Sequence, residues 1–295
     1  RPTALITGGV GGIGRAICLT LALNGFQVLF TYRSKFNEAQ RLEKELAGSG
    51  HQSFQLDVCD SHQIDKLALT ISENTRQLDL LVNCAGMTRF VPHQDMDSLD
   101  DELIDQIFQV NWRGSFSTIR SFRKLLENSP EALIVNISSI AGKTGEGSNV
   151  AYCASKAALD SMTRSLARAL APKIRVVSVA PGVVETNTPE NNVTNPPNAS
   201  QNNRSFHFEE KSELKSIHLC LWSLWSQIAS QSQNRQSRKA SAEPRCRATL
   251  QCSLSILTVS HPIAPCQIIR ATEKFDAITA SDPTVSSDLM SHQFA

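Results

Sequence analysis

Short apolar runs alternate with segments of helical apolar spacing from the start of the chain to about residue 180. The apolar runs, which are typical of strands, are residues 4–7, 27–32, 52–56, 78–82, 132–137 and 174–179. The segments with helical spacing that follow them are residues 13–23, 37–47, 61–75, 100–126 and 150–171. This alternation predicts an α/β fold: a doubly wound parallel sheet of the Rossmann type, with six strands in this part of the chain.

The composition changes sharply near residue 186. All 14 glycines lie between Gly8 and Gly182, and Ser, Gln and Asn dominate the sequence that follows, as in residues 227–241. Such a segment has too little apolar surface to offset the entropy of ordering it. We therefore expect a folded domain over residues 1–186 and an atypical Ser/Gln/Asn-rich tail over residues 187–295 that is poorly ordered.

Charge and cysteine usage exclude several classes of protein. The formal net charge of +1 gives no basic excess for neutralising the phosphates of a nucleic acid. No apolar run approaches the roughly 18 residues that a membrane-spanning helix needs. The eight cysteines include no Cys-x-x-Cys pair, so we expect no metal site. Free thiols suit a reducing compartment, either the cytoplasm or an organellar matrix.

A glycine-rich string joins the first predicted strand to the first predicted helix. Residues 7–14 read TGGVGGIG. Glycines let a backbone approach a pyrophosphate closely, and the amides at the positive end of the following helix bind its charge. The position of this string between a strand and a helix favours a nucleotide-binding turn over a purely structural one.

The residues after the second predicted strand indicate which nucleotide binds. An acidic side chain there would hydrogen-bond the 2′-hydroxyl of NAD, but this chain has Arg33 and no acid at that place. Arg15, just after the glycine string, is a second cation that we expect on the same side. Two cations without a carboxylate favour the 2′-phosphate of NADP over NAD, with solvated surface charge as the alternative.

A tyrosine and a lysine share one face of the last predicted helix. Tyr152 and Lys156 are four residues apart. The pKa of a free tyrosine, about 10, is too high for efficient proton transfer at neutral pH, and a nearby lysine ammonium lowers it. Ser139 lies just past the fifth strand, at the edge where ligands of a parallel sheet bind. We predict that Ser139 hydrogen-bonds a substrate oxygen that Tyr152 protonates.

These motifs, in their order and spacing, resemble those of the short-chain dehydrogenase/reductase family over residues 2–186, with the strongest similarity to its 3-oxoacyl-acyl-carrier-protein reductase type. The matching motifs are Thr7-Gly8-x-x-x-Gly12-x-Gly14, Asn83-Cys84-Ala85-Gly86, Asn111, Ser139 with Tyr152-x-x-x-Lys156, and Pro181-Gly182-x-x-x-Thr186. Cys84 departs from the family's pattern, which has a second Asn there. A buried cysteine behaves as a small apolar residue, so we expect little effect.

The resemblance implies a role for each matching residue. Tyr152 would be the acid in reduction and the base in oxidation, and Ser139 would orient the carbonyl. Lys156 would hold the nicotinamide ribose and tune Tyr152, while Asn111 would anchor a water that relays protons to Lys156. Together with Arg15 and Arg33, the cofactor site would comprise Thr7, Gly8, Gly12, Ile13, Gly14, Asp57, Val58, Asn83, Ala85, Gly86, Tyr152, Lys156, Pro181, Gly182 and Thr186.

Two of these residues have alternative interpretations. In the resemblance, Asp57 would accept from the adenine amino group with Val58 packed beside it. Asp57 could instead cap the helix that starts near Ser61, and Asn111 could be a helix-kink residue.

The function that the resemblance implies is an oxidoreductase. It would transfer a hydride between NADP(H) and a carbonyl or secondary alcohol, with a 3-oxoacyl thioester on acyl-carrier-protein as one substrate. Two alternatives stay open. One is an NAD-dependent alcohol or sugar-alcohol dehydrogenase, and the other is an inactive, truncated or frameshifted product that at most binds the nucleotide.

After Thr186 the chain departs from the family's pattern. The family has a seventh strand, preceded by glycine-rich sequence and followed by Asp-Gly-Gly, and a chain with no glycine after Gly182 lacks it. The sixth strand would then be an unprotected apolar edge, which invites aggregation. Family oligomers often use that edge, so the sequence argues against a tetramer, while a homodimer stays open.

Overall fold

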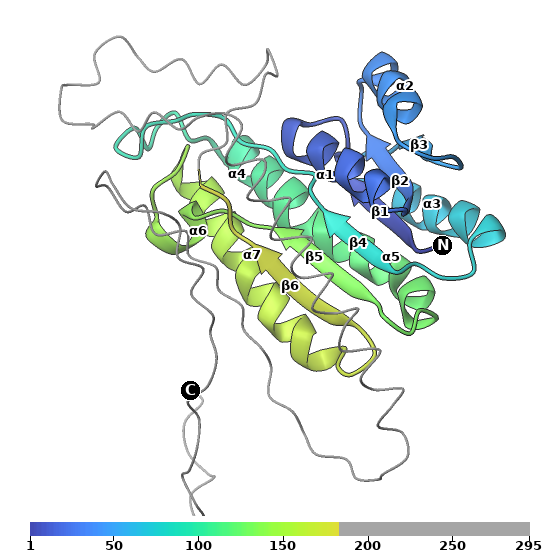
Figure 1. The fold of residues 1–295 in the computed structure, drawn as a ribbon. Helices are drawn as coiled ribbons and strands as arrows, with labels where there is room; N and C mark the ends of the chain where they lie inside the picture. Colours follow the sequence, from blue (N-terminus) through green and yellow to red (C-terminus); the bar gives the residue numbers. More distant parts are fainter. Residues whose placement is uncertain (183–295) are drawn as a thin grey trace, which may run out of the picture. The chain divides into compact units, whose positions relative to one another are not determined.

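One parallel sheet organises residues 1–182, which are the residues that the computed structural model describes (Figure 1). Its strands are β1 (Thr3–Thr7), β2 (Gln27–Tyr32), β3 (Gln52–Gln55), β4 (Leu80–Asn83), β5 (Leu133–Ile137) and β6 (Arg175–Val179). They lie in the order β3-β2-β1-β4-β5-β6, and every neighbouring pair is parallel. The predicted Rossmann-type sheet with six strands is confirmed. Thr186 and the tail over residues 187–295 lie outside the described residues, and so does the region in which the sequence predicts that the seventh strand is lacking.

Eight helical segments connect these strands. They are α1 (Gly12–Leu23), α2 (Phe36–Glu45), α3 (Ser61–Asn74), α4 (Asp101–Phe108), η1 (Gln109–Gly114), α5 (Ser115–Glu127), α6 (Ala141–Thr144) and α7 (Val150–Ala169). Within residues 1–182, none of them has the length and apolarity that crossing a bilayer requires.

The segment predicted as a single helix over residues 100–126 is interrupted. A π-helical stretch, η1, lies between α4 and α5, and a π-helix shifts the backbone hydrogen bonds by one residue. Two hydroxyl groups donate to carbonyl oxygens in this stretch: Ser115 to the carbonyl of Asn111 at 3.1 Å and Thr118 to that of Gly114 at 2.8 Å. The apolar spacing continues through η1, which is why the pattern alone predicts an unbroken helix.

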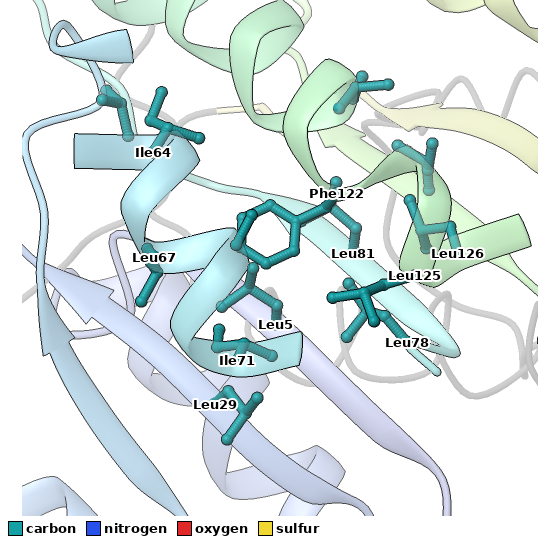
Figure 2. Close-up of a cluster of buried hydrophobic side chains, with 14 of the residues drawn as sticks. Leu5, Leu29, Ile64, Leu67, Ile71, Leu78, Leu81, Phe122, Leu125 and Leu126 are labelled. Atoms are coloured by element: carbon teal, nitrogen blue, oxygen red, sulfur yellow. The ribbon is translucent and has the colours of Figure 1, made fainter. Parts of the chain in front are cut away.

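The strand register places one row of apolar side chains across the sheet. Leu5 is paired with Leu29 on one side and with Leu81 on the other, and the row continues through Ile134 to Val176. Helices α3, α5 and α7 cover this face. Figure 2 shows Phe122 of α5 lying over it among the leucines of the strands. The opposite face is covered by α1 and α2. A sheet buried on both faces accounts for the near-continuous apolar runs of its central strands.

Strand β6 forms one edge of the sheet in the part of the chain that the structure describes. It pairs with β5 from Leu133↔Arg175 to Ile137↔Val179. Val177 and Val179 are only partly buried, whereas every residue of β5 is buried. Within residues 1–182, β6 is thus an apolar strand at the edge of the sheet, in agreement with the sequence pattern. The expected effect of this edge on oligomer formation stays a prediction.

The strand order reverses between β1 and β4. From β1 the chain moves outward through β2 and β3, and then returns to the other side of β1 with β4. The crevice at the carboxyl ends of strands at such a reversal is where ligands bind in open α/β sheets. The candidate residues should therefore gather at the ends of β1 and β4.

Candidate active site

The glycine turn after β1 lies against the end of β4. Gly8 has φ of +69°, which L side chains rarely adopt, and a Cβ there would lie only 2.9 Å from the Cα of Ala85. The hydroxyl of Thr7 accepts from the amides of Cys84 and Ala85 at 3.0 and 3.1 Å. The predicted residues of the first two motifs are thus brought together, and the turn tolerates no side chain at Gly8.

The first turn of α1 is oriented for an anion. Its N-cap is Gly11, and no side chain caps it within residues 1–182. The first amides of a helix have no intrahelical acceptors, and they carry the positive end of the helix dipole. A close glycine turn leading to an uncapped helix start fits a dinucleotide pyrophosphate, which the amides at and after Gly12 would bind.

The two predicted phosphate-binding cations are not side by side. Arg33 is exposed just before α2, and it has no carboxylate partner among residues 1–182. Arg15 forms an ion pair with Glu45, the last residue of α2. A ten-residue helix is about 15 Å long, so Arg33 precedes one end of α2 while the Arg15 side chain reaches the other.

The segment after β3 holds Asp57 and Val58 in place. The Asp57 carboxylate accepts from the amide of Cys59 at 2.9 Å, and Val58 packs against Gly114 of η1, where a Cβ would lie 2.9 Å from the valine. The alternative role of Asp57 as the cap of α3 is wrong. Asp60 caps that helix, because its carboxylate accepts from the amides of His62 and Gln63.

Helix α7 places the predicted acid–base pair on one face. The Lys156 ammonium nitrogen lies 5.7 Å from the centroid of the Tyr152 ring. Ser139, just beyond β5, hydrogen-bonds the Tyr152 side chain. A Cβ on Gly86 would lie 3.4 Å from Oδ1 of Asn111 and 3.7 Å from Nζ of Lys156. The end of β4, η1 and α7 thus meet at this point, beside the serine and the tyrosine.

Burial has the largest effect on the pKa values of Tyr152 and Lys156. It raises the pKa of Tyr152 above its usual value, and the hydrogen bond from Ser139 only partly opposes the rise. The expected lowering by Lys156 does not occur in this structure. Burial lowers the pKa of Lys156 to about 8, against the opposing influence of Cys84 and Asp160. Tyr152 is therefore a protonated donor at neutral pH, next to a lysine that titrates close to physiological pH.

The thiol of Cys84 is held in its neutral form. Burial raises its pKa to about 12, while the charge of Lys156 acts in the opposite direction. The thiolate is the reactive form of cysteine, so the raised pKa lowers the reactivity of this partly buried thiol. This agrees with the expectation that Cys84 acts as a small apolar residue. Within residues 1–182, no group of three His, Cys, Asp or Glu side chains could hold a metal ion.

Asn111 joins η1 to the segment after β4. Its Oδ1 accepts from the amide of Met87 at 2.8 Å, and its Nδ2 donates to the carbonyl of Met87 and the hydroxyl of Ser155, both at 3.0 Å. Asn111 lies inside the π-helical stretch, which agrees with its interpretation as a residue of helix irregularity. It also lies close to Gly86, so it belongs to this group of residues as well. The proton-relaying water stays a prediction.

Asn83 is buried at the end of β4, and its predicted contact with the cofactor stays a prediction. Its Nδ2 donates to Oδ1 of Asn136 on β5 at 2.8 Å, and Asn136 donates to the hydroxyl of Thr163 on α7 at 2.9 Å. The Oδ1 of Asn83 is buried and has no hydrogen-bond partner in the described part of the chain. Asn83 therefore fastens β4 to β5, and through Asn136 to the helix that carries Tyr152.

Two residues that contact this group are not identified by the sequence motifs. The buried hydroxyl of Ser155 donates to the carbonyl of Tyr152 at 2.8 Å and accepts from Asn111. The buried side chain of Asn149 caps α7, because it accepts a hydrogen bond from the backbone N–H of Tyr152. An Asn just before a predicted helix is a general N-cap signal, and it could have indicated Asn149. Pro181 accepts from the amide of Ile140 at 2.9 Å, which holds the last predicted motif near Ser139.

Comparison with known proteins assigns this arrangement to a family. Residues 2–196 match the family described as short chain dehydrogenase. The chain is 32% identical over 185 residues to the 3-oxoacyl-acyl-carrier-protein reductase of Staphylococcus aureus, which covers 62% of this chain and 74% of the relative.

Solved structures give the same result. A dehydrogenase/reductase from Sinorhizobium meliloti is 34% identical with a TM-score of 0.59, over 63% of this chain and 73% of the other. A short-chain dehydrogenase from Shigella flexneri, solved in complex with NADP, is 29% identical with a TM-score of 0.58, over 63% of this chain and 79% of the other.

Proposed function

Because the chain belongs to the short-chain dehydrogenase/reductase family of NAD(P)-dependent oxidoreductases, we propose that it reduces the ketone of a 3-oxoacyl thioester with NADPH. The observation that carries this proposal is the placement of Ser139, Tyr152 and Lys156 around one point at the carboxyl edge of the sheet. The relative from Staphylococcus aureus, named for 3-oxoacyl groups on acyl-carrier-protein, supports the substrate class.

Each side chain has a defined task in this reaction. Ser139 donates a hydrogen bond to the carbonyl oxygen and holds it against Tyr152. The Tyr152 hydroxyl transfers its proton to that oxygen as the carbonyl becomes an alcohol. Lys156 supplies positive charge beside the tyrosinate that remains, which stabilises it. The cofactor, when bound, supplies the hydride.

The cofactor would be held by the residues at the ends of the first four strands. The amides of the glycine turn and of the first turn of α1 would bind the pyrophosphate, and Asp57 with Val58 would contact the adenine. Arg33 is the cation for the 2′-phosphate, which favours NADP over NAD. Because Arg15 is paired with Glu45, the preference for NADP rests on Arg33. The NADP complex of the relative from Shigella flexneri supports this choice.

One experiment tests the cofactor and the reaction together. The purified chain is titrated with NADPH and with NADH by cofactor fluorescence, and then assayed with the acetoacetyl thioester of N-acetylcysteamine. We expect tighter NADPH binding and thioester-dependent oxidation of NADPH, and we expect Tyr152→Phe to abolish the oxidation while it still binds NADPH. Tighter NADH binding would favour the NAD-dependent alcohol dehydrogenase, and binding without turnover would favour a product that only binds nucleotide.

A further inference from the structure

Asn149 is a fully buried residue at the start of the helix that carries the acid–base pair. Its relative exposure is 0%, and it immediately precedes α7. The Oδ1 of Asn149 accepts from the amide of Tyr152 at 2.7 Å. This bond satisfies an amide that has no intrahelical acceptor, and it fixes the backbone of Tyr152 at the first turn.

The other end of the same side chain bonds a different part of the molecule. The Nδ2 of Asn149 donates to the carbonyl of Arg89 at 2.7 Å and lies 3.3 Å from the hydroxyl of Thr88. Both partners belong to the segment that follows Gly86, more than 60 residues before α7 in sequence. One amide group therefore bonds two chain segments that flank the site.

Further bonds join these segments along their length. The amide of Val91 donates to the carbonyl of Ser148 at 2.8 Å, and Nε2 of His93 donates to the carbonyl of Gly147 at 3.0 Å. Beneath these bonds, Val91 packs with Ala151 of α7 in a small apolar cluster. Residues 88–93 thus form a strip bonded to residues 147–149, and Asn149 is its buried member.

We propose that Asn149 is a positioning residue that holds the 88–93 strip and Tyr152 in one fixed relation at the substrate side of the site. The strip begins two residues after Gly86, where a Cβ would lie 3.7 Å from Nζ of Lys156. The strip is bonded to Gly147, where a Cβ would lie 3.4 Å from the Tyr152 ring, so movement of the strip should change the space beside that ring. The effect on substrate binding rests on the proposed function, whereas the effect on the strip does not.

The amide group is needed because it accepts and donates at once. Aspartate lacks the N–H that reaches Arg89, and serine is too short to reach it, although either can cap the helix. Asn149→Ser therefore removes the link to the strip and keeps the cap, while Asn149→Ala removes both. Asn128→Ala is the matched control, because Asn128 also donates an amide hydrogen to a backbone carbonyl, that of Arg76 at 3.0 Å, away from the site.

Hydrogen–deuterium exchange of the full chain tests the proposal without any substrate. In Asn149→Ser, we expect the amide of Val91 to exchange about 2- to 10-fold faster than in the wild type, with the amide of Tyr152 unchanged. In Asn149→Ala both amides should exchange faster, and in Asn128→Ala neither. The proposal would be overturned if the amide of Val91 exchanged at the wild-type rate in both Asn149→Ser and Asn149→Ala. In that case Asn149→Ala would lower only the melting temperature.

Kinetics with the acetoacetyl thioester then connect the strip to the reaction. We expect Asn149→Ser to raise KM for the thioester about 3- to 10-fold, with the Kd for NADPH and the pH dependence of kcat unchanged. Asn149→Ala should also alter that pH dependence, because the backbone of Tyr152 loses its cap. Faster exchange at Val91 with an unchanged KM would overturn the substrate-side role. A wild-type chain without turnover would instead contradict the proposed function, and the exchange data would still decide whether Asn149 holds the strip.

Discussion

The ammonium of Lys156 donates a hydrogen bond to the carbonyl oxygen of Ile137 at 2.9 Å. Ile137 is the last residue of β5, so this bond fixes the lysine at the carboxyl edge of the sheet beside Ser139. Lys156 is 6% exposed, and burial lowers its pKa to about 8. A charged group held in such an environment is retained for its chemistry rather than for stability.

Replacing this lysine should therefore stabilise the fold and abolish the reaction. A pKa lowered from 10.5 to about 8 corresponds to about 3 kcal/mol of destabilisation of the charged form, offset by about 1 kcal/mol from the bond to Ile137. We predict that Lys156→Met raises the free energy of unfolding at pH 7 by about 1–3 kcal/mol, measured by urea denaturation.

The sign of the pH dependence provides a second check on Lys156. The folded chain binds this proton less tightly than the unfolded chain, so Lys156 should contribute a rise in stability as the pH increases from about 8 to 10.5, while the raised pKa of Cys84 acts in the opposite direction. This contribution to the rise should vanish in Lys156→Met. Lys66→Met on the exposed face of α3 should change stability by less than about 0.5 kcal/mol and leave the rise in place. A loss of stability in Lys156→Met would contradict the argument from burial.

Ketone reduction should lose rate above about pH 8. Burial raises the pKa of Tyr152, so the acid stays protonated through neutral pH, and the group that titrates first as the pH rises is Lys156. We predict that kcat/KM for the acetoacetyl thioester is flat near neutrality and falls as Lys156 loses its charge. The measurement is kcat/KM between about pH 6 and pH 10, with fixed ionic strength. A kcat/KM that stays flat up to about pH 10 would contradict the role of Lys156 in the decline.

Arg33 and Arg15 should contribute differently to NADP binding. Arg33 has no carboxylate partner within residues 1–182, whereas Arg15 is paired with Glu45. We predict that Arg33→Ala weakens NADPH binding about 10-fold or more, since a charged hydrogen bond to the 2′-phosphate is lost, and leaves NADH binding within about 2-fold. Arg15→Ala, as the matched variant, should change the ratio of the two affinities by less than about 3-fold. Fluorescence titration with both cofactors measures this, and an equal loss in both variants would show that Arg15 also contacts the phosphate.

The fold could be predicted from the sequence because the spacing of apolar residues in each segment agrees with the burial of that segment in the structure. The row from Leu29 through Leu5 to Leu81 lies across a sheet covered on both faces, and each strand carries the apolar run that such burial requires. The largest shift among the strands is that of β4, from the predicted residues 78–82 to Leu80–Asn83. There the carboxylate of Asp79 accepts from the amide of Thr3, a side-chain bond that an apolar pattern does not report.

The site was predictable only where side chains act in known motifs. Tyr152 and Lys156 need nothing but helical spacing to share a face. The π-helical stretch around Asn111 and the link from Asn149 to Arg89 depend on tertiary hydrogen bonds between distant segments. The ion pair of Arg15 with Glu45 could not be predicted for the same reason, because Glu45 lies on another helix.

Asp79 is buried, and it joins the segment before β4 to β1 and to the loop after α5 at the amino edge of the sheet. Its carboxylate accepts from the amide of Thr3, the hydroxyl of Ser129 and the side-chain amide of Gln77, each at 2.7 Å. Removing it leaves buried donors without an acceptor, and each such donor costs about 1–3 kcal/mol. We predict that Asp79→Ala lowers the free energy of unfolding by about 3 kcal/mol or more, and Asp79→Asn by less, since the amide keeps one acceptor oxygen.

The control for Asp79 is an aspartate with an exposed bond of the same type. Asp65 accepts from the hydroxyl of Ser121 at 2.5 Å on the surface, where water replaces the lost partner. Asp65→Ala should therefore cost less than about 1 kcal/mol. Urea denaturation of the three variants measures the difference, and NADPH titration of Asp79→Asn should give the wild-type Kd because the cofactor edge lies at the opposite ends of the strands. Equal losses for Asp79→Ala and Asp65→Ala would show that burial does not decide the strength of this network.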